Sequence, residues 1–241
     1  MIVLLTDFGC SEYVGVIKAV IHGLAPAATV VDLTHTIRPQ SVIEASWVLK
    51  CNYRYFPKGS TFCAVVDPGV GTGRRAVAVK TTGYFFVAPD NGLVWEAVRR
   101  QRIECTRQLP VPPGASRTFH ARDVFARAAA MCELGRFDRL GRPVRHLRKL
   151  AHYKRGRTGI VVRIDHFGNV VTNLRKLAKR RYAVRTAGAE RTLPYFSTYA
   201  AAPDGELFLI EGSNGTLEVS LKNGNAAAEL AVQPGEKITI R

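Results

Sequence analysis

The stretch TFCAVVDPGVGTGRRAVAV, residues 61–79, decides the fold class and marks a place for chemistry. A β-branched apolar run ends on Asp67, a proline and three alternating glycines follow, and a second apolar run begins after Arg74 and Arg75. Two buried strands joined by a tight turn are predicted, with a carboxylate at one end of the turn and a guanidinium at the other. On these residues alone a purely architectural turn is as good an interpretation as a functional one. Phosphate binding is disfavoured, because the glycines match neither the Walker spacing nor Gly-x-Gly-x-x-Gly.

Short apolar runs and helical patterns alternate around this stretch. The strand-like runs lie at 2–7, 29–35, 74–82 and 84–90, and the helical patterns at 14–24, 42–56, 92–100 and 123–134. This alternation predicts an α/β domain with a mixed, largely parallel sheet. Because ligands bind beyond the carboxyl ends of such strands, we expect the aspartates that end four of them to gather at one edge: Asp7, Asp32, Asp67 and Asp90.

The second part of the chain has a different pattern. From Gly159 onward, strand-like runs are separated by Gly, Asn and Asp, with little helical periodicity. This pattern predicts a smaller all-β barrel or sandwich. The chain is therefore expected to hold two domains: 1–150, an α/β domain, and 151–241, a β domain.

Composition excludes several classes of protein. The chain has 241 residues, of which 46% are hydrophobic, but no apolar run approaches the ~20 residues that span a bilayer. The N-terminal MIVLLTDFG indicates a first strand rather than a signal peptide, so a soluble, cytoplasmic protein is expected. The five cysteines form neither a CxxC pair nor a Cys/His cluster, and no metal site is predicted.

The net charge of +16 is the strongest compositional signal. Arg136–Arg157 holds nine Lys and Arg residues against Asp138 alone, and a second basic cluster covers Arg175–Arg185. Such clusters can bind nucleic acid or another polyanion. No RNA-binding, zinc-finger or helix-turn-helix pattern accompanies them, so a solvated basic surface is the favoured interpretation and nucleic acid the less favoured one.

Four further motifs place polar groups beside apolar segments. They are LLTDFG at 4–9, APDNGL at 88–93, FHARDVF at 119–125 and IDHFGNVVTN at 164–173. With EGSNG at 211–215 and NGNAA at 223–227, their order and spacing resemble the S-adenosylmethionine hydroxide adenosyltransferase family, to which the fluorinating and chlorinating enzymes are related. The resemblance extends over nearly the whole chain.

The resemblance implies hydrolysis of S-adenosylmethionine to adenosine and methionine, without a metal or other cofactor. It assigns the catalytic roles to Asp67, Arg74 and His120, with water or hydroxide attacking C5′ of the ribose. The residue types suit that reaction. A carboxylate can accept a proton from water, and a permanently charged guanidinium keeps that carboxylate ionised.

Substrate-binding positions follow from the same resemblance. Asp7 would receive both ribose hydroxyls, and its alternative role is to cap the following helix. In the β domain, Asn169 would bind the adenine edge, Phe167 or Tyr195 would cover a ring face, and Ser213 would contact the methionine end. The family is also expected to form a homotrimer, with each site between the N-terminal domain of one subunit and the C-terminal domain of the next.

Two departures from the family pattern affect these assignments. The loop CSEYVG, 10–15, is one residue shorter than usual and carries Glu12 where an aspartate helps to receive the substrate ammonium group. Ala121 stands where glycine is common. Two alternatives remain: a halogenase that makes 5′-halo-5′-deoxyadenosine, and a noncatalytic adenosine-binding or nucleic-acid-associated protein.

Overall fold

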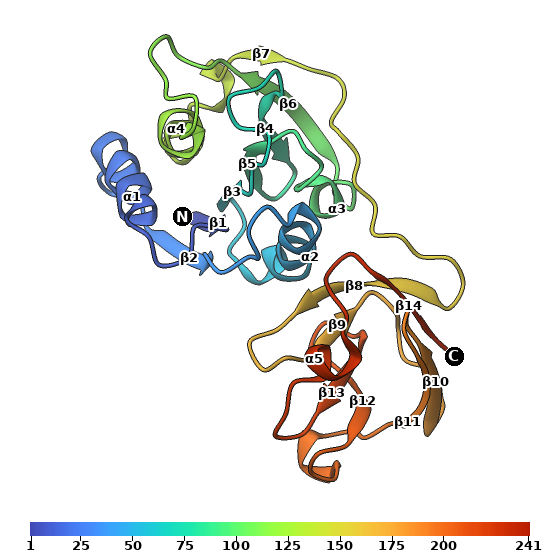
Figure 1. Cartoon of the computed structure of the whole chain (residues 1–241). Helices are drawn as coiled ribbons and strands as arrows, with labels where there is room; N and C mark the ends of the chain where they lie inside the picture. The colour runs from blue at the N-terminus through green and yellow to red at the C-terminus, as the bar shows by residue number, and fades with distance from the viewer. The chain divides into compact units, whose positions relative to one another are not determined.

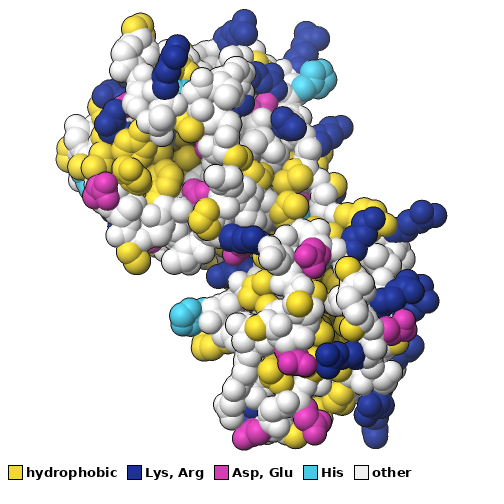
Figure 2. All heavy atoms as spheres, in the orientation of Figure 1, with side chains coloured by type: hydrophobic (Ala, Val, Ile, Leu, Met, Phe, Trp, Pro, Cys, Tyr) yellow, Lys and Arg dark blue, Asp and Glu magenta, His cyan; other side chains and the backbone are white.

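The structure is a computed structural model that describes all residues, Met1–Arg241. The chain forms two compact units, Met1–Ala151 and His152–Arg241 (Figure 1). None of its helices combines the length and the apolar composition needed to cross a bilayer. Lys and Arg side chains stand at many separate points around the visible outline of both units (Figure 2).

The N-terminal unit is built on a seven-stranded mixed sheet of order β2-β1-β3-β5-β4-β6-β7. The neighbours β2, β1, β3 and β5 are parallel, whereas β4, β6 and β7 add antiparallel pairs, so the predicted fold class is confirmed. The strands are β1 Ile2–Thr6, β2 Val30–Thr34, β3 Thr61–Val65, β4 Ala76–Thr81, β5 Phe85–Pro89, β6 Ile103–Leu109 and β7 Arg142–Pro143. The sequence had indicated neither β6 nor β7.

Helices cover both faces of this sheet, and every residue of the central strands β1 and β3 is buried. In β1, Ile2 and Leu4 pack with α1 and α4, whereas Val3 and Leu5 pack with α2 on the opposite face. The helices are α1 Glu12–Leu24, α2 Val42–Asn52, α3 Trp95–Val98 and α4 Ala126–Glu133 (Figure 1). The predicted helix at 92–100 is confined to one turn, and a 3₁₀ turn, Tyr53–Tyr55, follows α2.

The C-terminal unit is an antiparallel, barrel-like sheet of order β11-β10-β14-β8-β9-β13-β12. A short bridge between Tyr195 and Leu209 links the end of β11 to β12 and nearly closes the barrel. The strands are β8 Thr158–Ile164, β9 Val170–Thr172, β10 Arg181–Arg185, β11 Glu190–Pro194, β12 Leu207–Glu211, β13 Leu217–Leu221 and β14 Lys237–Ile240. The predicted β class is confirmed, and the helix α5, Ala226–Leu230, is an addition.

Candidate active site

A tight turn connects β3 to β4 and brings Asp67 and Arg74 together. The amide of Val70 donates to the carbonyl of Asp67 over 3.2 Å, which begins the turn. Gly71 has φ +76°, and a Cβ there would lie 2.3 Å from the carbonyl oxygen of Arg117. Both the positive φ and the close backbone therefore require glycine at this position.

Asp67 and Arg74 form a buried ion pair. Arg74 Nε lies 2.9 Å from both carboxylate oxygens, and Nη2 donates to Oδ2. Only 7% of the Asp67 side chain and 10% of the Arg74 side chain are exposed. Arg74 also lies over the ring of Phe125, with Cζ 5.2 Å from the centroid, which fixes the guanidinium plane.

His120 completes this cluster as the N-cap residue of a π-helical turn, Ala121–Phe125, that leads into α4. Its Nδ1 lies 3.0 Å from Arg74 Nη2. Burial lowers the pKa of His120, the charge of Arg74 lowers it further, and the carboxylates of Asp67 and Asp123 oppose the shift. A neutral imidazole is thus favoured beside the ion pair, and the three residues predicted as catalytic lie in one cluster.

Asp7 follows β1 directly and lines the same cavity as Asp67 and His120, a pocket of about 430 Å³. Its Oδ2 accepts a hydrogen bond from the backbone amide of Gln40 over 2.8 Å. It does not cap α1, whose N-cap is Ser11. The aromatic wall of the pocket is formed by Phe8, Tyr13 and Phe119.

The other two strand-end aspartates have different surroundings. Asp90 follows β5 and receives hydrogen bonds from Arg75 and from the amide of Arg148, so it holds the segment that precedes the second unit. Asp32 lies within β2 rather than beyond its end and pairs with Lys18 at 2.6 Å. The expectation that all four aspartates gather at the strand ends is therefore wrong for Asp32, because β2 continues to Thr34.

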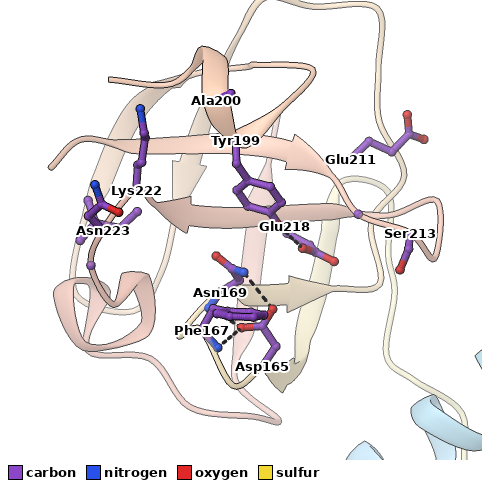
Figure 3. Close-up of a pocket in the computed structure, with 13 residues that line it drawn as sticks. Asp165, Phe167, Asn169, Tyr199, Ala200, Glu211, Ser213, Glu218, Lys222 and Asn223 are labelled. Atoms are coloured by element: carbon purple, nitrogen blue, oxygen red, sulfur yellow. Dashed lines mark hydrogen bonds between the residues drawn. The ribbon is translucent and has the colours of Figure 1, made fainter. Parts of the chain in front are cut away.

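A second, larger pocket of about 840 Å³ lies in the C-terminal unit. The rings of Phe167 and Tyr199 both border it, and Asn169 lines it beside Phe167 (Figure 3). Phe167 is 75% exposed, which is unusual for a phenylalanine and leaves its ring free to contact a ligand. The pocket thus combines the polar side chain of Asn169 with two aromatic rings.

Asp165 holds the loop that presents Phe167 and Asn169. Its carboxylate accepts from the amides of both residues over 2.9 Å and from Asn169 Nδ2 over 2.8 Å. Asn169 Oδ1 remains available to accept a hydrogen bond in the pocket. Ser213 lines the same pocket.

Two other candidate residues are not brought into these pockets. Glu12 is the first residue of α1, is exposed and does not line the 430 Å³ pocket. Tyr195 bridges to Leu209 and lies under Lys176 at 4.5 Å, outside the lining of the larger pocket.

Tyr199 and Glu218 line the larger pocket but were not predicted from the sequence. The hydroxyl of Tyr199 donates to Glu218 Oε2 over 3.3 Å. Burial raises the pKa of Glu218 and also raises that of Tyr199, to about 12, with the nearby carboxylate adding to the shift of Tyr199. The sequence carried no distinctive signal for Glu218, because LEVSL alternates apolar and polar residues as an ordinary half-buried strand does.

Comparison with known proteins agrees with this arrangement. Residues 2–141 match the SAM hydroxide adenosyltransferase N-terminal domain, and residues 159–239 match the C-terminal domain. A curated (R)-S-adenosyl-L-methionine hydrolase of Thermus thermophilus is 38% identical over 98% of this chain and 97% of its own length. A fluorinase of Nocardia brasiliensis is 27% identical over 73% of this chain and 71% of its own.

A solved structure has the same fold along the entire chain. An uncharacterized conserved protein from Thermotoga maritima superimposes with a TM-score of 0.92 and 34% identity, covering 100% of both chains. Both domains of the family are present, in order, and together they account for nearly all of the sequence. The chain therefore belongs to the SAM hydroxide adenosyltransferase family.

Proposed function

We propose that the protein hydrolyses S-adenosyl-L-methionine to adenosine and L-methionine. The observation that carries this proposal is the contact of Asp67, Arg74 and His120 at a pocket that also holds Asp7. The hydrolase name of the Thermus thermophilus relative supports the same reaction and specifies the (R) configuration at the sulfonium. The (R) epimer is therefore the proposed substrate.

The reaction is a displacement at the C5′ carbon of the ribose. Water forms the new C5′–O bond as the C5′–S bond breaks, methionine leaves as a neutral thioether, and one proton is released. The leaving group needs no general acid, so the protein must supply an oriented water and a proton acceptor. Asp67 is the proposed acceptor.

Arg74 and His120 act on that water in different ways. The paired guanidinium keeps the Asp67 carboxylate ionised and stabilises hydroxide character as the proton leaves. Because Nδ1 of His120 accepts from Arg74, its Nε2 carries the proton and can donate to the water oxygen. The contacts with Asp67 and His120 leave one lone pair of the water oxygen available to attack C5′.

The two units divide the remaining binding roles. Asp7 receives the ribose hydroxyls in the 1–150 domain, while the 151–241 domain supplies the adenine and methionine contacts. Asn169 binds the adenine edge, Phe167 covers one ring face, and Ser213 contacts the methionine end. Tyr199 is a better candidate than Tyr195 for the second aromatic surface, because its ring borders the pocket (Figure 3). Glu12, exposed at the start of α1, is the weakest of the proposed ligands.

We also propose a homotrimer in which different subunits contribute the two halves of each site. Its support is that the catalytic cluster and the aromatic pocket belong to separate units, each with its own open cavity. A catalytically competent monomer in sedimentation would contradict it, as would a fully active fragment ending near Arg157. The five free cysteines suit a reducing compartment, and we propose the cytoplasm.

The reaction is tested by incubating purified protein with the (R) and (S) epimers of the substrate, with a chelator present, and separating the nucleosides by chromatography. Adenosine and methionine from the (R) epimer are expected. Formation of 5′-chloro-5′-deoxyadenosine in chloride buffer would support a halogenase instead. The fluorinase relative has a lower sequence identity to this chain than the hydrolase relative, which makes the halogenase the weaker alternative.

A ligand sensor that binds nucleic acid is the alternative suggested by the net charge of +16. It predicts no adenosine release and retention of RNA or DNA with a defined sequence preference. Retention that disappears at moderate salt, without preference, would reflect the basic surface alone.

A further inference from the structure

The loop that carries Asp7 is attached at both ends to a single residue, His35. His35 follows β2, and its Nδ1 lies 2.8 Å from the hydroxyl oxygen of Thr6, the residue just before Asp7. Its backbone carbonyl accepts from the amide of Gly9 over 2.7 Å, two residues after Asp7. The side chain and the backbone of one residue therefore fix the points between which Asp7 is held.

The hydroxyl of Thr6, at the start of the loop, is buried and makes two contacts. Thr6 is 1% exposed, and its hydroxyl oxygen accepts from the amide of Phe8 over 3.3 Å while it contacts the His35 ring. The hydroxyl can donate to Nδ1 only if that nitrogen is unprotonated. In this arrangement the proton of a neutral His35 ring is on Nε2.

An acidic partner orients the other side of the ring. Nε2 of His35 lies 3.1 Å from Asp32 Oδ1, and Lys18 of α1 lies 2.6 Å from Asp32 Oδ2. Burial raises the pKa of Asp32, but the hydrogen bond from Lys18 and the proximity of His35 outweigh it, and the net shift is downward. An ionised Asp32 thus links the helix α1, the strand β2 and the His35 ring.

We propose that His35 is a positioning residue for the substrate: it holds the Thr6–Gly9 loop so that the Asp7 carboxylate faces the ribose hydroxyls. The proposal rests on the proposed function, in which Asp7 binds the ribose. A carboxylate that accepts hydrogen bonds from two adjacent hydroxyls tolerates little rotation. The amide of Gln40 restrains only Oδ2 of Asp7, so the loop itself must fix the orientation of the carboxylate. The hydrogen bonds of His35 go to the Asp7 loop and those of Arg74 to Asp67 and His120, so His35 should affect binding more than chemistry.

The test compares His35→Ala, His35→Asn and His22→Ala, in which His22 is an exposed histidine of α1. Adenosine affinity is measured by calorimetry and turnover by adenosine release. The loss of one buried hydrogen bond predicts a roughly tenfold weaker adenosine affinity and a similar rise in KM for His35→Ala, with kcat nearly unchanged. His35→Asn keeps an acceptor near the position of Nδ1 and should recover most of the affinity.

Unchanged adenosine affinity in His35→Ala, or a fall in kcat at constant KM, would overturn the proposal. If His35→Ala does not fold, Asp32→Asn gives a milder test, because it removes the charge that orients the ring and should weaken adenosine affinity by less. If His35→Ala folds and His35→Asn binds adenosine no better than it does, the Thr6 contact is not the cause and the proposal also fails.

Hydrogen exchange separates this proposal from the proposed function. A wild-type protein that neither binds adenosine nor releases it would refute the function, but the loop could still be examined without ligand. Residues 6–9 should then exchange faster in His35→Ala than in His22→Ala. Equal exchange in the two variants would show that His35 does not hold the loop.

Discussion

Arg74 and His120 are joined by a hydrogen bond in which only Arg74 can be the donor. The guanidinium Nη2 lies 3.0 Å from His120 Nδ1. Because arginine has no acceptor, Nδ1 must carry the lone pair and Nε2 the proton. The contact therefore determines the tautomer of His120 as well as its position.

The charge state of His120 gives the first prediction. Its pKa lies below the ordinary 6.5, first because of burial and then because of Arg74. Replacing Arg74 with alanine removes the positive charge, so the pKa of His120 should rise. An NMR titration of the His120 ring in the wild type and in Arg74→Ala measures this directly, and a pKa that does not rise would contradict the contact.

The same shift affects stability with a definite sign. Between the folded-state pKa of His120 and the unfolded-state value near 6.5, the unfolded chain binds more protons than the folded protein. The free energy of unfolding should therefore rise as the pH increases through this window. His120→Gln should remove that part of the pH dependence in denaturant titrations, whereas His22→Ala, at an exposed histidine of α1, should leave it in place.

The second prediction separates catalysis from binding at Asp67 and Asp7. Asp67→Asn should lower turnover by about 10²–10⁴-fold, the usual contribution of a general base, and leave adenosine affinity nearly intact. Asp7→Ala should weaken adenosine binding itself. Steady-state kinetics and calorimetry on both variants check this. Normal turnover in Asp67→Asn would show that the proposed proton acceptor is wrong even if the reaction is right.

Arg74→Lys is the third prediction. Lysine keeps the charge, but its single ammonium group cannot replace the two arginine donors, Nε and Nη2, that bind Asp67 while Nη2 also contacts His120. Turnover should therefore fall toward the level of Asp67→Asn, although the net charge is unchanged. A lysine variant with wild-type kcat would indicate that charge alone is sufficient.

The fourth prediction concerns the turn between β3 and β4. Gly71→Ala forces a side chain into a positive φ and against the carbonyl of Arg117, so it should destabilise the fold by about 1–3 kcal/mol and displace Arg74. Gly73→Ala is the matched control, because a Cβ there would have no neighbour within 4 Å and the φ of Gly73 is ordinary. Denaturant unfolding and turnover should distinguish the two variants, and equal losses would contradict the proposed role of Gly71.

The sequence predicted those features of the candidate site that depend on local patterns. Apolar runs ending in Asp67 and Asp7 identified strand ends, and neighbouring parallel strands then bring such ends to one edge. It could not place Asp32 correctly, because the register of β2 against β1 decides where that strand ends. Tyr199 was missed because it lies in a short 3₁₀ turn, Tyr199–Ala201, and reaches the pocket beside Glu218 of β13, a contact between distant residues that short-range periodicity does not encode.

The fifth prediction tests the aromatic surface of the C-terminal unit. Phe167 is 75% exposed, so its removal should cost the fold little, whereas loss of base stacking is worth roughly 1–3 kcal/mol. Phe167→Ala should therefore weaken adenosine affinity by about 10- to 100-fold without lowering the melting temperature.

Tyr55→Ala provides the control, because Tyr55 is 70% exposed but belongs to the N-terminal unit and lines neither the aromatic nor the catalytic pocket. If exposure of an aromatic ring were incidental, the two variants would bind adenosine equally well. If Phe167 covers the base, only its own variant loses affinity, and Tyr199→Ala should show a loss of similar size, since its ring borders the same pocket (Figure 3). If both Phe167→Ala and Tyr199→Ala keep the wild-type adenosine affinity, adenine does not bind in this pocket.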